Sequence, residues 1–104
     1  MVRGTTPTIL FYSKQIREKD VTDAEFTFSQ RGRTILTKEM CTGDPSFVVA
    51  DGGISVTLSQ IETLVFDARF PLFVQLRVEI GDLVMATPPN KMTVEESLDG
   101  GVLT

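Results

Sequence analysis

The chain has 104 residues, of which 41% are hydrophobic and 23% are charged, and its formal net charge is −4. This length and composition indicate one folded domain and exclude disorder over the whole chain. The acidic balance argues against nucleic acid as a partner, because a phosphate backbone requires clustered Lys and Arg. No apolar run approaches the ~18 residues of a membrane helix, and positions 1–5 lack the apolar stretch of a secretory signal. The expected location is therefore the cytoplasm of the producing cell, or a particle assembled there.

The first predicted strand is Thr8–Tyr12, which follows an extended lead-in. Its odd positions lie on one face, and Leu10 and Tyr12 lie on the other. Because both faces are apolar, the pattern does not decide which one is buried. Residues 13–20 are rich in charge and predict a solvated connector, although one helical turn also fits.

A β-hairpin is predicted next. Apolar and polar residues alternate over Asp23–Gln30, and a β-rich run resumes at Thr34–Met40. Arg31 and Gly32 between them form a two-residue loop. The register set by this loop gives three cross-strand pairs, of which the last joins opposite charges: Phe28 with Ile35, Thr27 with Leu36, and Glu25 with Lys38.

The middle of the chain carries two short strands and the start of a helix. Turn clusters at 42–45 and 51–53 flank the apolar run Phe47–Val49. Ile54–Leu58 then alternates between apolar and polar residues, as a half-buried strand does.

A short helix follows this strand. Ser59 and Glu62 have the spacing of a capping box, which predicts one or two helical turns through Val65. Such a helix forms a crossover between two sheets, and we expect Leu64 and Phe66 to close the end of the core.

The central strand is the run Phe70–Ile80, in which every even position is apolar. Gln75, Arg77 and Glu79 stand between these positions, so the period is two, as in a strand with one buried face. Burial of each even side chain contributes roughly 1.5–3 kcal/mol, which is large against a net stability of about 5–15 kcal/mol. This face must therefore be covered by a second layer.

A second hairpin ends the central strand. Gly81 at the first loop position suits a type II′ turn. The register gives these pairs: Ile80 with Leu83, Val78 with Met85, and Leu76 with Thr87. It is expected to continue the buried face onto the partner strand. Pro88 and Pro89 end that strand because proline has no backbone N–H, and 91–96 allow one last strand.

The predicted fold is all-β. The pattern of elements indicates an immunoglobulin-like antiparallel β-sandwich of seven or eight short strands with one short helical crossover. The sandwich is expected to form a single domain over residues 1–104, with extended segments at 1–7 and 98–104.

The sequence offers little catalytic chemistry, since histidine is absent. This removes Ser-His-Asp and Cys-His catalysis, imidazole metal sites and the usual general base near neutral pH. Lysine-based or carboxylate-based catalysis remains formally possible, but Asp44 and Asp51 lack the spacing of a calcium loop. Cys41 has no disulfide partner and is expected to be half-buried. We therefore predict no enzyme, no cofactor and no metal site.

Phe73 is the first candidate for an interaction residue, because it lies beside Gln75 and Arg77 on the polar face of the central strand. A covering loop would account for an apolar side chain there. A subunit or partner contact is the alternative explanation.

Several stretches carry a family resemblance, and in order they span nearly the whole chain: Arg3–Thr8, Phe28–Gln30, Leu58–Gln60, Glu62–Leu64, Val74–Arg77 and Leu98–Val102. Together they resemble a family of small structural proteins encoded by phages and prophages of Firmicutes. Members of that family resemble the N-terminal β-sandwich of siphophage baseplate upper proteins, which attach receptor-binding parts to the tail. The charged connector 13–20 and the extra Gly101 depart from the family pattern. The resemblance implies no catalytic residue.

The resemblance leads us to expect a non-enzymatic virion structural or adaptor protein of the tail or baseplate, found in the virion or in the bacterial cytoplasm during assembly. Its expected partners are other phage structural proteins or copies of itself, on which Arg3–Pro7 and Leu98–Thr104 would pack. The alternative hypothesis is a carbohydrate-binding module for host-surface recognition. In that case Phe73 and Tyr12 would be stacking platforms, and Gln75 and Arg77 would be polar contacts.

Overall fold

The computed structural model describes residues 1–96. These residues form eight strands, one short α-helix and two 3-10 turns, η1 and η2. The elements in chain order are β1 (Thr8–Tyr12), η1 (Glu18–Asp20), β2 (Val21–Gln30), β3 (Arg33–Glu39), η2 (Met40–Thr42), β4 (Phe47–Ala50), β5 (Gly53–Thr57), α1 (Gln60–Leu64), β6 (Leu72–Ile80), β7 (Leu83–Ala86) and β8 (Asn90–Met92). In this part of the chain, no helix has the length and apolar character needed to span a membrane.

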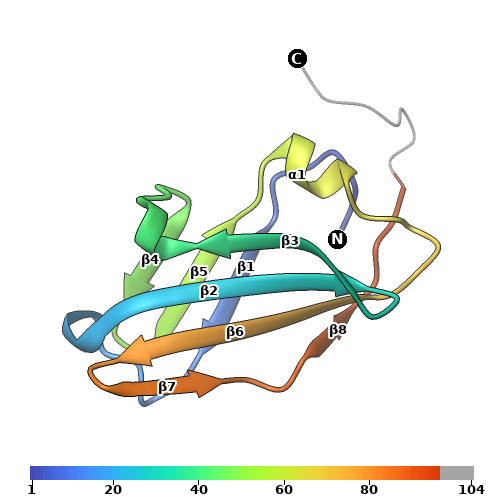
Figure 1. Cartoon of the computed structure of the whole chain (residues 1–104). Helices are drawn as coiled ribbons and strands as arrows, with labels where there is room; N and C mark the ends of the chain where they lie inside the picture. Colours follow the sequence, from blue (N-terminus) through green and yellow to red (C-terminus); the bar gives the residue numbers. More distant parts are fainter. Residues whose placement is uncertain (97–104) are drawn as a thin grey trace.

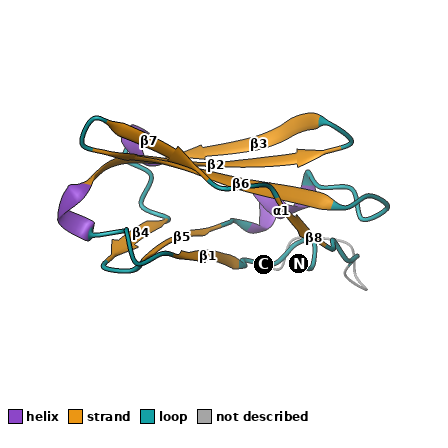
Figure 2. Ribbon diagram, turned by 90° about the horizontal axis from the view of Figure 1, so that it is seen from below, coloured by secondary structure: helices purple, strands orange, loops and turns teal. Residues whose placement is uncertain are grey.

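The strands form two antiparallel sheets (Figure 1). The smaller sheet has the order β1-β5-β4, and the larger has the order β3-β2-β6-β7. β8 pairs with the first half of β6, on the side where β7 pairs with the second half. Figure 2 shows the two sheets as separate layers, and α1 connects β5 of one layer with β6 of the other. The predicted β-sandwich with a helical crossover is confirmed.

The core lies between the two sheets. The predicted alternation in β2, in β5 with the residue that follows it, and in β6 places these side chains inward, each at most 6% exposed: Ala24, Phe26, Phe28, Ile54, Val56, Leu58, Leu72, Val74, Leu76 and Val78. The Phe28 and Phe66 ring centroids lie 5.7 Å apart, so the segment after α1 packs against β2. One hydrophobic cluster therefore joins both sheets and the crossover.

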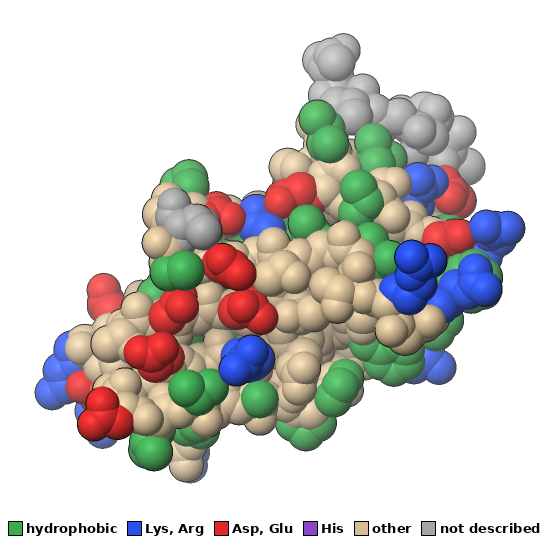
Figure 3. All heavy atoms as spheres, viewed as in Figure 1, with side chains coloured by type: hydrophobic (Ala, Val, Ile, Leu, Met, Phe, Trp, Pro, Cys, Tyr) green, Lys and Arg blue, Asp and Glu red, His purple; other side chains and the backbone are tan. Residues whose placement is uncertain are grey.

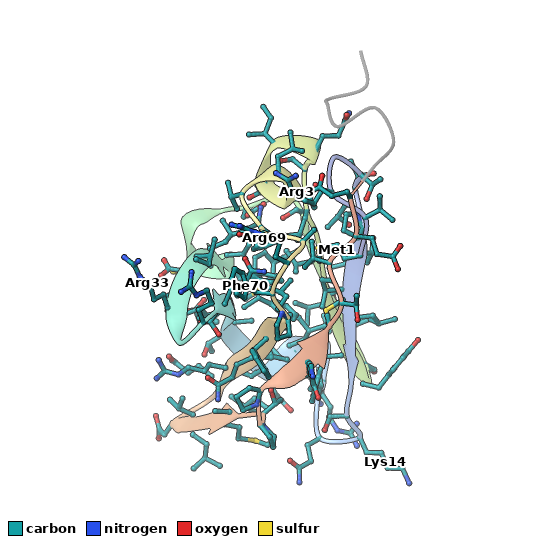
Figure 4. All side chains as sticks on the ribbon, turned by 90° about the vertical axis from the view of Figure 1, so that its right-hand side faces the viewer. Met1, Arg3, Lys14, Arg33, Arg69 and Phe70 are labelled. Carbon is teal, nitrogen blue, oxygen red and sulfur yellow. The ribbon has the colours of Figure 1, made fainter. Side chains whose placement is uncertain are left out.

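Phe70 differs from the prediction, since it lies before β6 and is only half-buried. The guanidinium carbons of Arg31 and Arg69 lie 4.6 and 5.5 Å from the centroid of its ring. Figure 4 shows Arg69 and Phe70 on neighbouring positions of the loop that precedes β6. Cation–π contacts thus replace burial at this position.

The β2–β3 hairpin keeps its predicted register only beside the turn. A β-bulge beyond that point leaves Ile35 without a partner on β2 and shifts the rest of β3 by one residue. The observed pairs include Gln30 with Arg33, Ser29 with Thr34, Phe28 with Leu36, and Phe26 with Lys38. The predicted pairs of Phe28 with Ile35, Thr27 with Leu36 and Glu25 with Lys38 are wrong. Because a one-residue shift exchanges the faces of a strand, Lys38 is turned toward the inner side.

β7 pairs with β6 in the predicted register, but it does not continue the buried face. Leu83 and Met85, which share the inner side with Ile80 and Val78, are 67% and 39% exposed. Among residues 1–96, the smaller sheet ends at β1 and provides no strand over the inner side of β7.

The connector before β2 contains more structure than the predicted solvated loop. Ile16 is 4% exposed and belongs to the core, and Glu18–Asp20 forms the turn η1. The backbone N–H of Gly52 donates to the carbonyl of Ile16 at 2.7 Å, which holds the connector against the β4–β5 turn.

The predicted capping box of α1 is confirmed. The Ser59 hydroxyl accepts a hydrogen bond from the Glu62 backbone N–H, and the Glu62 carboxylate accepts one from the Ser59 N–H. Phe66 is buried as expected, whereas Leu64 is half-buried and α1 buries Thr63 instead.

The N-terminal segment packs on its own chain. The Arg3 guanidinium contacts the Glu96 carboxylate at 2.6 and 2.8 Å and donates to the Leu64 carbonyl at 2.7 Å. The Gly4 N–H donates to the Thr63 hydroxyl at 2.9 Å, so this segment is tied to α1. The predicted tail at 98–104 lies outside the described residues.

Candidate docking surface

Three of the predicted interaction residues lie together on the outer face of the larger sheet. Phe73 is half-buried and faces residues of β2 and β8. Gln75 donates from Nε2 to the carbonyl of Thr87 at 2.8 Å, which ties it to the segment after β7. Arg77 is the exposed member of the three.

Tyr12 lies on the opposite side of the molecule. It belongs to the outer face of the smaller sheet and is 75% exposed. The full thickness of the sandwich separates it from Phe73, so the two rings cannot stack on the same ligand. The structure does not assemble the sugar platform that the sequence suggested.

The outer face of the smaller sheet is the most unusual surface of the molecule. We call it the uncharged face, and it consists of Thr8, Leu10, Tyr12, Val48, Ala50, Gly53, Ser55 and Thr57. Leu10 and Val48 both pair with Ser55 and are 48% and 61% exposed. None of the eight residues is charged, although 23% of the chain is.

Gly53 lies beside the two largest side chains of this face. A Cβ atom at Gly53 would lie 3.7 Å from Leu10 Cδ1, 3.8 Å from Tyr12 Cδ1 and 3.3 Å from the Phe11 carbonyl oxygen. The two large side chains therefore lie against the outer side of the glycine. The tightest of the three approaches is to the Phe11 carbonyl oxygen, so a side chain at position 53 would press against the β1 backbone.

The outer face of the larger sheet has the opposite character. Figure 3 shows acidic side chains over the end near the β6–β7 hairpin and Lys or Arg side chains at the β2–β3 hairpin end. A shallow hollow of about 90 Å³ on this sheet is lined in part by Asp23, Glu25, Arg77 and Glu79. Charge is thus abundant on one outer face and missing from the other.

An apolar groove opens beside β1. It consists of two adjoining cavities of about 340 and 230 Å³ that share Phe11, Leu76, Thr87 and Asn90 as lining residues. It lies between the free edge of β1 and the strands β7 and β8, where the larger sheet extends beyond the smaller one. None of the described residues that line it is charged.

Sequence reasoning named Tyr12 but missed Leu10, Val48 and the groove. Two signals were present in the sequence. Both faces of Thr8–Tyr12 are apolar, and Asp51 is the only charged residue between Pro45 and Ile61. A strand pair with so little charge on either face indicates a second contact surface.

A cluster of three charged side chains lies on the other side of the sandwich, beside β3. Lys38 Nζ lies 2.8 Å from a Glu62 carboxylate oxygen and 3.0 Å from one of Asp44, and the Lys38 side chain is 11% exposed. Desolvation by itself lowers the pKa of Lys38, but the hydrogen bonds and charges of Glu62 and Asp44 raise it overall. Hydrogen bonds from Ser46 lower the pKa of Asp44 to about 2, with a smaller contribution from Lys38. Desolvation by itself raises the pKa of Glu62, but hydrogen bonds from Lys38 and Ser59 lower it overall.

We expect the protein to lose stability as the pH falls from about 4.5 to about 2. The ordinary pKa values of Asp44 and Glu62 are 3.8 and 4.5, and folding lowers both. Their contribution is complete above the unfolded-state pKa and is lost as the pH falls through the folded-state value. Urea unfolding at pH 7, 4 and 2.5 measures this loss. Asp67, whose pKa Arg69 lowers to about 2, adds to it.

Lys38→Met is the matched variant for this prediction. It keeps the aliphatic stem and removes the ammonium group, so the difference in unfolding free energy between pH 7 and pH 2.5 should become smaller. If the difference stayed the same, Lys38 would not be a cause of the lowered pKa values of Asp44 and Glu62.

The remaining candidate groups have structural partners or unfavourable chemistry. Cys41 is exposed, so the expectation of a half-buried residue is wrong. Desolvation and the carboxylates of Asp23 and Glu39 raise the pKa of its thiol, which disfavours the nucleophilic thiolate. Asp51 accepts a hydrogen bond from the Glu18 N–H at 3.0 Å. Within residues 1–96, no group of three or more His, Cys, Asp or Glu side chains could hold a metal ion.

Comparison with known proteins adds no relative: no family model, no curated protein and no solved structure matches the chain. Its function is therefore inferred from its own residues and surfaces. Among these, the uncharged face and the groove beside it are the features that the fold itself does not require.

Proposed function

We propose that this chain is a non-enzymatic structural or adaptor protein of a phage virion, associated with the tail or the baseplate and acting through contacts with other structural proteins. The observation that carries the proposal is the uncharged face. The centres of protein interfaces are depleted in charged residues, and exposed contiguous apolar patches mark interaction sites. An acidic chain that keeps one sheet face free of charge has a surface suited to docking.

Two further observations support the other parts of the proposal. The phage assignment is supported by the ordered stretches from Arg3–Thr8 to Leu98–Val102 that resemble the phage family. The non-enzymatic part is supported by the absence of histidine and by the groove, which no carboxylate, lysine or cysteine lines among the described residues. The hydroxyl groups in this lining, among them those of Ser13 and Tyr12, have no histidine, lysine or carboxylate beside them among the described residues of the groove to activate them as nucleophiles.

Incorporation into particles tests the proposal. We expect mass spectrometry of purified phage particles from the producing strain to detect the wild-type chain. We expect Val48→Lys to reduce its incorporation at least about tenfold, because a charge at the centre of a contact face must be desolvated without a partner.

Val84→Lys is the matched control. Val84 is 58% exposed against 61% for Val48, and it lies on the outer face of the larger sheet. This variant should enter particles at the wild-type level. Absence of the wild-type chain from particles would contradict the virion assignment, and equal loss with both variants would contradict the role of the uncharged face.

A further inference from the structure

The edge of β1 that faces the groove carries backbone N–H and C=O groups that do not bond to β5. The Leu58 N–H donates to the Pro7 carbonyl and the Ser13 N–H donates to the Gly52 carbonyl, each at 3.0 Å. In an antiparallel ladder, hydrogen-bonded and non-hydrogen-bonded pairs alternate. The odd positions from 7 to 13 therefore bond to the β5 side. Thr8, Leu10 and Tyr12 direct their N–H and C=O groups away from β5, where residues 1–96 provide no strand partner.

Within residues 1–96, this edge also lacks three features that protect natural edge strands: charge, an internal proline and a bulge. Protected edges carry charged side chains, an internal proline, a bulge or a covering segment. β1 has the sequence Thr-Ile-Leu-Phe-Tyr, pairs with β5 without a break in register, and contains no charge and no proline. It is a continuous template for one more antiparallel or parallel strand.

The groove beside the edge matches such a strand. The larger sheet extends to β7 where the smaller one stops at β1, so the sandwich is one strand short on this side. Residues paired with Ile9 and Phe11 would point inward, toward Leu76, Val78 and Met85, and the cavities there measure about 230 and 340 Å³. Residues paired with Thr8, Leu10 and Tyr12 would extend the uncharged face.

We infer that β1 accepts an extended segment of a different protein, about five or six residues long, which is uncharged and has an apolar residue at every second position. The backbone edge demands the extended conformation, and the uncharged lining of the groove demands apolar side chains on one face. The uncharged face beside it offers no oppositely charged side chain to a charge on the other face of the segment. This inference rests on the proposed function, for which it names the kind of partner.

A synthetic peptide tests the inference. The probe is acetyl-Thr-Val-Thr-Val-Thr-Val-amide, and its control has the same composition in the order Thr-Thr-Thr-Val-Val-Val. We expect the alternating peptide to slow hydrogen exchange of the Leu10 and Tyr12 amides at least about tenfold, because it hydrogen-bonds them. The control peptide, which cannot present one apolar face, should leave both rates unchanged.

Two variants separate backbone pairing from side-chain contact. Leu10→Pro removes an N–H that does not bond to β5, so we expect an intact fold by circular dichroism and at least about tenfold weaker peptide binding. Leu10→Ala shortens the same side chain but keeps the N–H, and should bind within about threefold of wild type. Met85→Trp should weaken binding by filling the groove while leaving the β1 backbone unchanged.

The outcomes are distinguishable from those of the particle experiment. Equal binding of both peptides, or binding that Leu10→Pro does not weaken, would overturn the inference while the Val48→Lys result stands. Protection of the Leu10 amide with rising protein concentration and no peptide would identify a second copy as the occupant, which would also overturn it. Peptide binding by a chain that is absent from particles would instead contradict only the virion assignment.

Discussion

Phe28→Ala is expected to lower the free energy of unfolding by about 3–5 kcal/mol, the cost of removing a fully buried aromatic ring. Phe28 is 0% exposed, and its ring centroid lies 6.5 Å from that of Phe26 and 5.7 Å from that of Phe66. It therefore joins the last part of β2 to the segment that follows α1. The net free energy of unfolding of a domain is only about 5–15 kcal/mol, so the variant should be close to unfolding at 25 °C. Urea unfolding followed by circular dichroism measures the change.

Phe73→Ala provides the control for this prediction. It makes the same chemical change on the neighbouring strand, but Phe73 lies on the outer face and is half-buried. We expect less than half of the loss found for Phe28. Equal losses would contradict the assignment of inner and outer faces in the larger sheet.

Gln30→Leu is expected to lower the free energy of unfolding by about 2–4 kcal/mol. Each buried polar group left without a hydrogen-bond partner costs roughly 1–3 kcal/mol. Gln30 is 3% exposed, and its side chain supports the loop before β6. Its Nε2 donates to the carbonyls of Asp67 and Phe70 at 2.8 and 3.1 Å, and its Oε1 accepts from the Asp67 N–H at 2.9 Å. Urea unfolding measures the total loss of stability. Faster hydrogen exchange of the Asp67 amide would show that the loss arises in the loop before β6.

Gln30→Glu distinguishes hydrogen bonding from packing at this site. The variant keeps the shape and one acceptor but places a carboxylate against two carbonyl oxygens. We expect a loss at pH 7 at least as large as that of Gln30→Leu, and a smaller one near pH 4, where a protonated carboxyl can donate again. A loss below about 0.5 kcal/mol for both variants would show that solvent replaces these bonds.

The parts of the fold that were predictable depend on local chemistry. Alternation identified the buried faces of β2, β5 and β6, because side chains alternate between the two faces of any strand. The capping box at Ser59 and the hairpin at Gly81 involve residues no more than a few positions apart. In each case the residues that make the contact are close neighbours in the chain.

The errors arose where distant segments decide the outcome. The bulge at Ile35 turns Lys38 inward, where it meets Asp44 and Glu62 from two other elements. Ile16 is buried because the connector folds back onto the core. Met85 is exposed because, in the part of the chain that the structure describes, the smaller sheet has no strand to cover it.

The candidate site was predictable only in part for the same reason. Tyr12 could be named as an exposed aromatic residue from its strand alone. Which neighbours share its face depends on the pairing of β1 with β5, which brings Leu10, Ser55 and Val48 into one row. The open edge of β1 likewise depends on which strand fails to pair beside it.

By itself, the sequence determined the strands, their buried faces, the capped helix and the shortage of catalytic groups, because periodicity, capping and composition act over a few residues. Only the tertiary structure decided which apolar side chains stay outside, since exposure depends on the width of the opposing sheet. The uncharged face and the unpaired edge of β1 exist because three strands are packed against a wider layer.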